Sequence, residues 1–204
     1  MTEALAFTAA EVAFVLREPV KSVKKALDDG PIEPKLIAKA GGKVRAVEWA
    51  DLLYLFAVRS LRDELTPKAR NEFYHALKRL PADHRTREVR FGRFCVAIDD
   101  FKAEVEARAG ELAALADKVE FRKDGEAVLK GTNVEVHRIA TLLSGGMSAE
   151  EVCADFPSLS PQQVTDARAY AEAHPKLGRP YPKTSFKRAI QGAGLEALDE
   201  ALDG

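Results

Sequence analysis

Apolar residues recur at helical spacing near the start of the chain and are interrupted by turn residues. Thr8 and Glu11 have the spacing of a capping box, which predicts a helix from Ala9. Pro19 suits the first turn of a second helix, and Gly30 predicts a left-handed residue at its end. Two short helices joined by a tight turn are typical of a helix-turn-helix.

The pattern then changes to two short apolar runs, Leu36 to Lys39 and Lys43 to Val47, on either side of Gly41-Gly42. Paired glycines tolerate positive φ, so we expect a hairpin that forms the wing of a winged helix. The helix that starts near Trp49 is apolar on several faces and must bury more than one of them. The apolar side chains on its additional faces are a candidate dimer contact.

A middle stretch alternates between apolar and polar residues from Val89 to Ile98, which predicts one or two strands with a bulge at Gly92. Asp99 can cap the amphipathic helix that follows. A second hairpin is expected around Asp124-Gly125.

Three short helices are expected near the C-terminus, because two further capping boxes begin at Ser148 and Ser160. Their predicted ranges are His137–Ser144, Ala149–Asp155 and Pro161–Ala173. The pattern as a whole predicts an α+β, mainly helical fold.

We divide the chain into four parts by these patterns. They are a winged helix-turn-helix at 1–82, a strand–helix dimerisation or connecting segment at 83–125, a trihelical domain at 126–174, and a basic tail at 175–204.

The composition, with 46% hydrophobic and 31% charged residues, fits a soluble globular protein and contains no apolar run long enough for a bilayer. We expect a cytoplasmic protein without a membrane partner. The formal net charge of -1 means that any polyanion partner must be recognised by local charge. Cys95 and Cys153 follow apolar periodicity and are expected to be buried thiols.

Lysines gather on the second predicted helix, on the face opposite its apolar stripe, and continue along the wing. A helix in the major groove and a wing on the backbone would bind DNA. The alternative is a solvated basic face. The candidate DNA-binding residues are Lys21, Ser22, Lys24, Lys25, Lys39, Lys43 and Arg45.

The C-terminal helices have helix-turn-helix spacing too, with Gln162, Gln163, Thr165 and Arg168 on the third. The charges near them are mainly acidic and would repel phosphate. Packing against another copy or another protein is therefore the preferred interpretation.

The segment from Ala173 to Leu195 contains no acid and combines cations, aromatic rings, prolines and glycines. It could be a disordered linker, a nonspecific nucleic-acid arm, or a segment that binds an acidic protein groove through charge-assisted hydrogen bonds. The candidate partner-binding residues are Lys176, Arg179, Tyr181, Lys183, Phe186, Lys187 and Arg188.

No residues have the spacing of a catalytic or metal site. His75, His84, His137 and His174 lack ligand partners at suitable spacing, and neither cysteine has an adjacent base. We expect no enzyme activity, no metal and no cofactor.

The sequence from Leu129 to Ala171 resembles a small trihelical domain of formerly unknown function. Asn133 and Glu135 stand where that family has arginine and proline. The residues that carry the resemblance are Gly131, Thr132, Val136, Gly146, Ser148, Glu150, Glu151, Phe156, Pro157, Leu159, Ser160, Val164, Ala169, Tyr170 and Ala171.

The N-terminal part looks like a winged helix of MerR type, and the combination is similar to VapB-like antitoxins. This resemblance implies an antitoxin that binds its operator as a homodimer and neutralises a PIN-domain ribonuclease toxin, whose magnesium-binding carboxylates the basic tail could engage. Two alternatives stay open: a MerR-like regulator without a toxin, and an interaction module that does not bind DNA.

Overall fold

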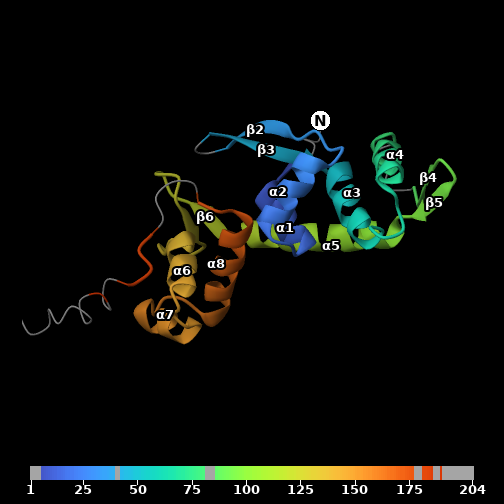
Figure 1. The fold of residues 1–204 in the computed structure, drawn as a ribbon. Coiled ribbons are helices and arrows are strands. Elements are labelled where there is room, and N and C mark those ends of the chain that lie inside the picture. Colours follow the sequence, from blue (N-terminus) through green and yellow to red (C-terminus); the bar gives the residue numbers. More distant parts are fainter. Residues whose placement is uncertain (1–5, 40–41, 81–85, 177–180, 186–188, 190–204) are drawn as a thin grey trace, which may run out of the picture. The chain divides into compact units, whose positions relative to one another are not determined.

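The computed structural model describes residues 6–39, 42–80, 86–176, 181–185 and 189. The chain divides into two compact units, residues 1–114 and 115–204 (Figure 1). The division lies in the last turn of α5 (Asp99–Ala116). The architecture is α+β and mainly helical, as predicted.

The first unit opens with a helix-turn-helix made of α1 (Ala9–Leu16) and α2 (Val20–Asp29). The predicted capping box is confirmed, because the Thr8 amide donates to Glu11 Oε2 at 2.6 Å and the Glu11 amide donates to Thr8 Oγ1 at 3.4 Å. These two amides, which have no acceptor within the helix, therefore have side-chain acceptors.

The left-handed residue of this motif is Arg17, with φ of 53°, where α1 ends. The expectation of a left-handed Gly30 is wrong, since Gly30 is extended with φ of -92° and ψ of 178°. Glycine is needed there for space, because a Cβ would lie 2.5 Å from the Ala26 carbonyl oxygen.

An antiparallel sheet in the order β1-β3-β2 carries the wing. Its strands are β1 (Ala6–Thr8), β2 (Lys35–Lys39) and β3 (Gly42–Glu48), with Phe7 opposite Val47 in the register. The β2–β3 hairpin confirms the predicted wing, whereas β1 was not predicted from the sequence.

Helices α3 (Trp49–Ser60) and α4 (Pro67–Lys78) complete the core of the first unit. Every residue of α3 from Asp51 to Ala57 is buried, including Leu52 at 0% exposure. The suggestion that the apolar surplus of this helix serves a dimer contact is therefore wrong, because its own unit already covers these side chains.

The middle hairpin consists of β4 (Glu88–Phe91) and β5 (Phe94–Ala97). Gly92 has φ of 54° in the turn between them, so it is a turn residue and not the expected bulge. The hairpin packs on α4, where the ring of Phe91 lies 5.1 Å from that of Phe73.

Helix α5 also packs within the first unit. Val105 is completely buried, and Arg108 Nη1 donates to the Val15 carbonyl at 2.9 Å while its guanidinium lies over the ring of Phe56. These contacts hold the C-terminal end of α1 in place.

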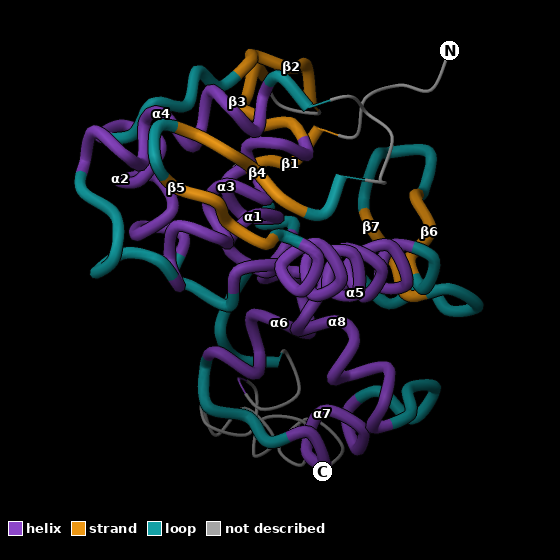
Figure 2. Tube along the Cα trace, turned by 90° about the vertical axis from the view of Figure 1, so that its right-hand side faces the viewer, coloured by secondary structure: helices purple, strands orange, loops and turns teal. Residues whose placement is uncertain are grey.

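The second unit starts with a hairpin of β6 (Val119–Phe121) and β7 (Ala127–Leu129). It continues with α6 (Val136–Ser144), α7 (Ala149–Asp155) and α8 (Pro161–Ala173), which Figure 2 shows as three short helices joined by loops. Their bounds differ from the predicted ones by a single residue, at the start of α6.

Candidate nucleic-acid and partner interfaces

Helix α2 separates an apolar face from a cationic face. Val23 and Leu27 are buried at 2% and 3% exposure, while Lys21, Lys24 and Lys25 are exposed. We call these three lysines the α2 lysine face. No ion pair between described residues involves any of their ammonium groups.

The wing cations differ from one another in their surroundings. Lys39 Nζ lies 2.8 Å from Glu11 Oε1, and Arg45 Nη1 lies 2.5 Å from Asp28 Oδ1. Lys43 is exposed and has no ion pair among the described residues.

The two paired cations fasten the wing to the helix-turn-helix. Glu11 joins the wing to α1 in addition to capping that helix, and Asp28 joins it to the last turn of α2. Sequence reasoning missed both partners, because neither acid lies near its cation in the chain. The predicted interface therefore contains four lysines without an ion pair among the described residues, the exposed Ser22, and two cations that serve the fold.

A second cluster ties the start of α3 to α4. The Glu48 carboxylate accepts from both Lys35 and Lys78, and these hydrogen bonds lower its pKa to about 2. Asp51 is 2% exposed and accepts from the Tyr74 hydroxyl at 3.0 Å. Burial and this carboxylate raise the pKa of Tyr74 to about 12.

An open cavity of about 810 Å³ lies next to α2 in the first unit. Ser22, Lys25, Arg59, Arg62 and Arg70 are among its lining residues. Two of these guanidinium groups are held by main-chain oxygens: Arg59 by Leu16, and Arg70 by Leu65 and Arg62. Acids line the cavity too: Asp29, and Glu18, whose Oε1 lies 3.2 Å from Arg59 Nε. The cavity therefore combines positioned guanidinium groups with direct access to the proposed DNA-binding helix.

The second unit brings part of the predicted tail site together. Lys176 Nζ lies 2.5 Å from Glu126 Oε1, and the Tyr181 hydroxyl donates to Glu126 Oε2 at 3.1 Å. Lys183 is exposed. Arg179, Phe186, Lys187 and Arg188 lie outside the described residues.

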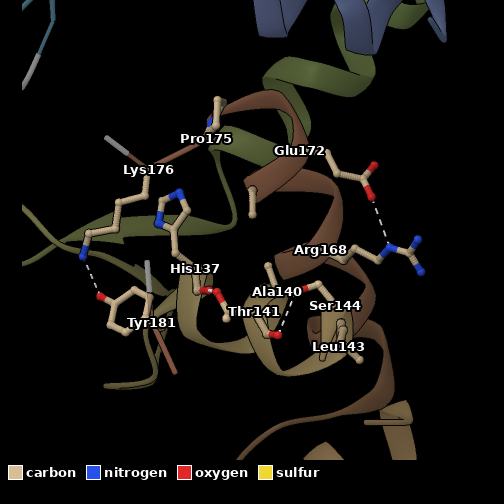
Figure 3. A pocket seen from close by; sticks show the side chains of 11 residues that line it. His137, Ala140, Thr141, Leu143, Ser144, Arg168, Glu172, Pro175, Lys176 and Tyr181 are labelled. Carbon is tan, nitrogen blue, oxygen red and sulfur yellow. Dashed lines mark hydrogen bonds and ion pairs between the residues drawn. The ribbon is translucent and has the colours of Figure 1, made fainter. Parts of the chain in front are cut away.

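A pocket of about 410 Å³ lies between α6, α8 and this part of the tail (Figure 3). His137, Thr141 and Ser144 line it from α6, and Arg168 and Glu172 line it from α8 as an ion pair of 3.1 Å. Its polar groups already have partners: His137 Nε2 lies 2.7 Å from the His174 carbonyl oxygen, and the Thr141 and Ser144 hydroxyls donate to main-chain oxygens of α6.

Part of the second unit is similar to a known protein family. Residues 122–171 match the family DUF433, described as a protein of unknown function. We call this stretch the DUF433 module. It contains β7, α6 and α7 in full and most of α8.

Two individual proteins are also similar. The uncharacterized protein y4eO of Sinorhizobium fredii (strain NBRC 101917 / NGR234) is 36% identical over 75 residues, which are 35% of this chain and 34% of that protein. The chain thus spans about a third of this curated relative. The crystal structure of Rv2018 from Mycobacterium tuberculosis is 14% identical, with 79% of this chain and 95% of that chain covered and a TM-score of 0.30.

The polar residues of α8 in the DUF433 module have local partners. Gln163 completes the capping box with Ser160, Gln162 donates to Asp166 Oδ1 at 3.0 Å, and Arg168 pairs with Glu172. These contacts leave α8 without a cationic face of the kind seen on α2.

Among the described residues, no three His, Cys, Asp or Glu side chains are placed to share a metal ion. Cys95 is exposed and donates to Glu88 at 3.3 Å, so the expectation that it is buried is wrong; β5 turns this side chain outward. Cys153 is half-buried.

Among the residues that the structure describes, every helix is too short or too polar to span a bilayer.

Proposed function

We propose that this chain is an antitoxin that represses its own operon and neutralises a PIN-domain ribonuclease toxin. The observation that carries the DNA-binding part is the α2 lysine face, whose cations lack acidic partners among the described residues and stand next to a wing of the same unit. The proposed contacts are Lys21, Ser22, Lys24 and Lys25 on α2 and Lys43 on the wing.

Unpaired cations are the ones that gain from binding DNA. A lysine that neutralises a phosphate releases condensed counterions, whereas a lysine that already pairs with a carboxylate must first lose that partner. Lys39 and Arg45 therefore contribute by holding the wing in position. A homodimer is part of the proposal, because palindromic operators match two-fold symmetric proteins.

The proposed toxin-binding part is the basic tail. Its support is the resemblance of most of the sequence to VapB-like antitoxins and the absence of acids from Ala173 to Leu195. Such a segment would bind a carboxylate cluster through charge-assisted hydrogen bonds and place aromatic rings in apolar pockets.

The DNA-binding proposal is tested by fluorescence anisotropy on the DNA that precedes the chain's own gene. Replacing the three lysines of the α2 lysine face by alanine should weaken binding at least about tenfold at moderate salt. The control removes two exposed lysines of the second unit, Lys123→Ala with Lys130→Ala, and should leave the affinity unchanged. Equal affinity in the triple variant and the control would refute the assignment of α2.

The toxin proposal is tested by deleting residues 176–204 and co-expressing the truncated chain with the protein encoded by the neighbouring gene. The truncation should abolish co-purification and neutralisation while operator binding persists. Neutralisation by the truncated chain would contradict the proposed role of the tail.

A second candidate is a transcriptional regulator without a toxin, and the cavity beside α2 favours it. A small anionic ligand in that cavity would contact Ser22 and Lys25 and compete with DNA for them. Such a regulator would keep operator binding, lack a toxin in co-purification, and respond to small anions in the anisotropy assay.

A further inference from the structure

The tail returns to the DUF433 module through two anchors. We call Lys176 and the described residues 181–185 the tail strap. At the first anchor, Lys176 and Tyr181 share the two oxygens of Glu126, at 2.5 and 3.1 Å. The Lys176 ammonium also donates to the Tyr181 hydroxyl at 2.7 Å and lies 4.3 Å from the centre of its ring. The pKa of Glu126 is lowered chiefly by its hydrogen bond with Lys176.

The second anchor is buried. Ser185 is 3% exposed, and its hydroxyl donates to Asp155 Oδ2 at 2.6 Å at the end of α7. The amide of Ala189 in turn donates to the Ser185 carbonyl at 2.9 Å. Between the anchors, Pro182, Lys183 and Thr184 are exposed, so the strap crosses the module surface and does not enter its core.

A glycine of the module permits this crossing. A Cβ on Gly145 would lie 2.3 Å from the Lys183 carbonyl oxygen and 3.0 Å from its Cβ. Gly145 has φ of -80° and ψ of -2°, a conformation that is compatible with most residues. The approach of the strap is therefore the tightest restriction at this position, ahead of the Leu142 carbonyl oxygen of α6, which would lie 3.2 Å from the same Cβ.

We infer that Glu126, Gly145 and Asp155 of the DUF433 module form a docking surface for an extended segment with cationic and aromatic side chains, and that its occupant is the chain's own tail strap. The docking surface itself does not depend on the proposed function, but its consequence for partner binding rests on that function. Lys176 and Tyr181 belong to the proposed toxin-binding set, yet a carboxylate of the same chain already engages them.

The docked strap restrains binding to an acidic partner. A partner that recruits Lys176 and Tyr181 must displace Glu126. Its apparent affinity therefore equals its intrinsic affinity multiplied by the fraction of molecules in which the strap is released. The anchored part of the tail thus resists acidic partners.

The decisive variant is Gly145→Ala, which alters neither the strap nor its anchoring acids. Trypsin cleavage after Lys183, followed by mass spectrometry on the full-length protein without partners, reports release of the strap. Overpacking of this kind should speed cleavage about tenfold or more. Gly110→Ala in α5 is the matched control, because a Cβ there meets nothing within 4 Å, and cleavage should stay at the wild-type rate.

A second variant, Glu126→Gln, removes the charge of the first anchor without any change in packing. It should also speed cleavage after Lys183, by a smaller factor. Unchanged cleavage in both variants would overturn the docking surface, and circular dichroism melting verifies that the module stays folded in each of them.

The restraint is tested separately with poly-L-glutamate as the acidic partner. Gly145→Ala and Glu126→Gln should bind it more tightly than the wild type, by about the factor seen in proteolysis. Faster cleavage with unchanged affinity would refute the restraint while leaving the docking surface in place. Neither assay involves DNA or a toxin, so failure of the proposed function is a distinguishable result.

Discussion

Replacement of Asp51 by alanine is the perturbation that the first unit should tolerate least. This carboxylate is 2% exposed and accepts hydrogen bonds from the Glu48 amide at 2.8 Å and the Tyr74 hydroxyl at 3.0 Å, while Lys78 Nζ lies 3.1 Å away. Loss of the capping interaction costs about 1 kcal/mol. The buried Tyr74 hydroxyl, left without this acceptor, costs about 1–3 kcal/mol more. Loss of the Lys78 contact adds little to this cost, because the Lys78 side chain is partly exposed and retains its ion pair with Glu48.

The expected loss in the free energy of unfolding is therefore about 3 kcal/mol. Urea denaturation followed by tryptophan fluorescence measures it, because Trp49 is the single tryptophan of the chain and reports on the first unit. Asp28→Ala is the control: it removes the exposed pair with Arg45 and should cost less than about 1 kcal/mol.

The Tyr74→Phe variant separates the two contributions. Alone it should cost about 1 kcal/mol, and in the Asp51→Ala background it should cost less, since the hydroxyl has already lost its acceptor. Equal costs in both backgrounds, or a loss below about 1 kcal/mol for Asp51→Ala, would refute the reasoning that this buried carboxylate joins α3 to α4.

Three further predictions concern the first unit. Alanine at the α2 lysine face should reduce the slope of log affinity against log salt by about 2–3, whereas Lys39→Ala should reduce it by less than about 1 because Glu11 already neutralises that ammonium; equal reductions per lysine would contradict the distinction. Gly30→Ala should lower the urea midpoint by an amount equivalent to about 1–3 kcal/mol, since its Cβ would overlap the Ala26 carbonyl; an unchanged midpoint would show that the turn adapts. The pKa of Glu48 is lowered from 4.5 to about 2, so its contribution to stability is complete above pH 4.5 and is lost as the pH falls toward 2. Glu48→Gln should flatten that part of the stability profile, and an equally steep profile would exclude Glu48 as its source.

Local signals predicted the helices of this chain well. Capping boxes at Thr8, Ser148 and Ser160 are formed within four consecutive residues, so the sequence contains all the information that places these helix starts. The β2–β3 hairpin likewise follows from two short apolar runs separated by glycines, although Gly42 belongs to β3 and pairs with Lys39. The strand β1 was missed because it has three residues and pairs with residues about forty positions away.

Ion-pair partners could not be predicted, because they depend on tertiary contacts. Glu11 and Lys39 are 28 positions apart, Asp28 and Arg45 are 17 apart, and Glu126 and Lys176 are 50 apart. A count of cations along the sequence treats all of them alike. The roles of Gly30 and Gly145 were equally hidden, because a close approach by another chain segment leaves no trace in the local pattern.

The placement of acids explains how a chain with a net charge of -1 could serve two anionic partners. In the first unit, carboxylates hold the wing cations and leave the α2 lysine face without acidic partners among the described residues. In the DUF433 module, Glu126 holds one cation of the tail itself, Lys176. Under the proposed function, the same kind of ion pair would have opposite consequences in the two units. Pairing in the first unit would select which lysines remain for phosphate, and pairing in the DUF433 module would withhold a lysine from a carboxylate partner. A partner of the tail must accordingly offer a stronger or denser set of carboxylates than Glu126 alone, as a metal-binding acidic cluster would.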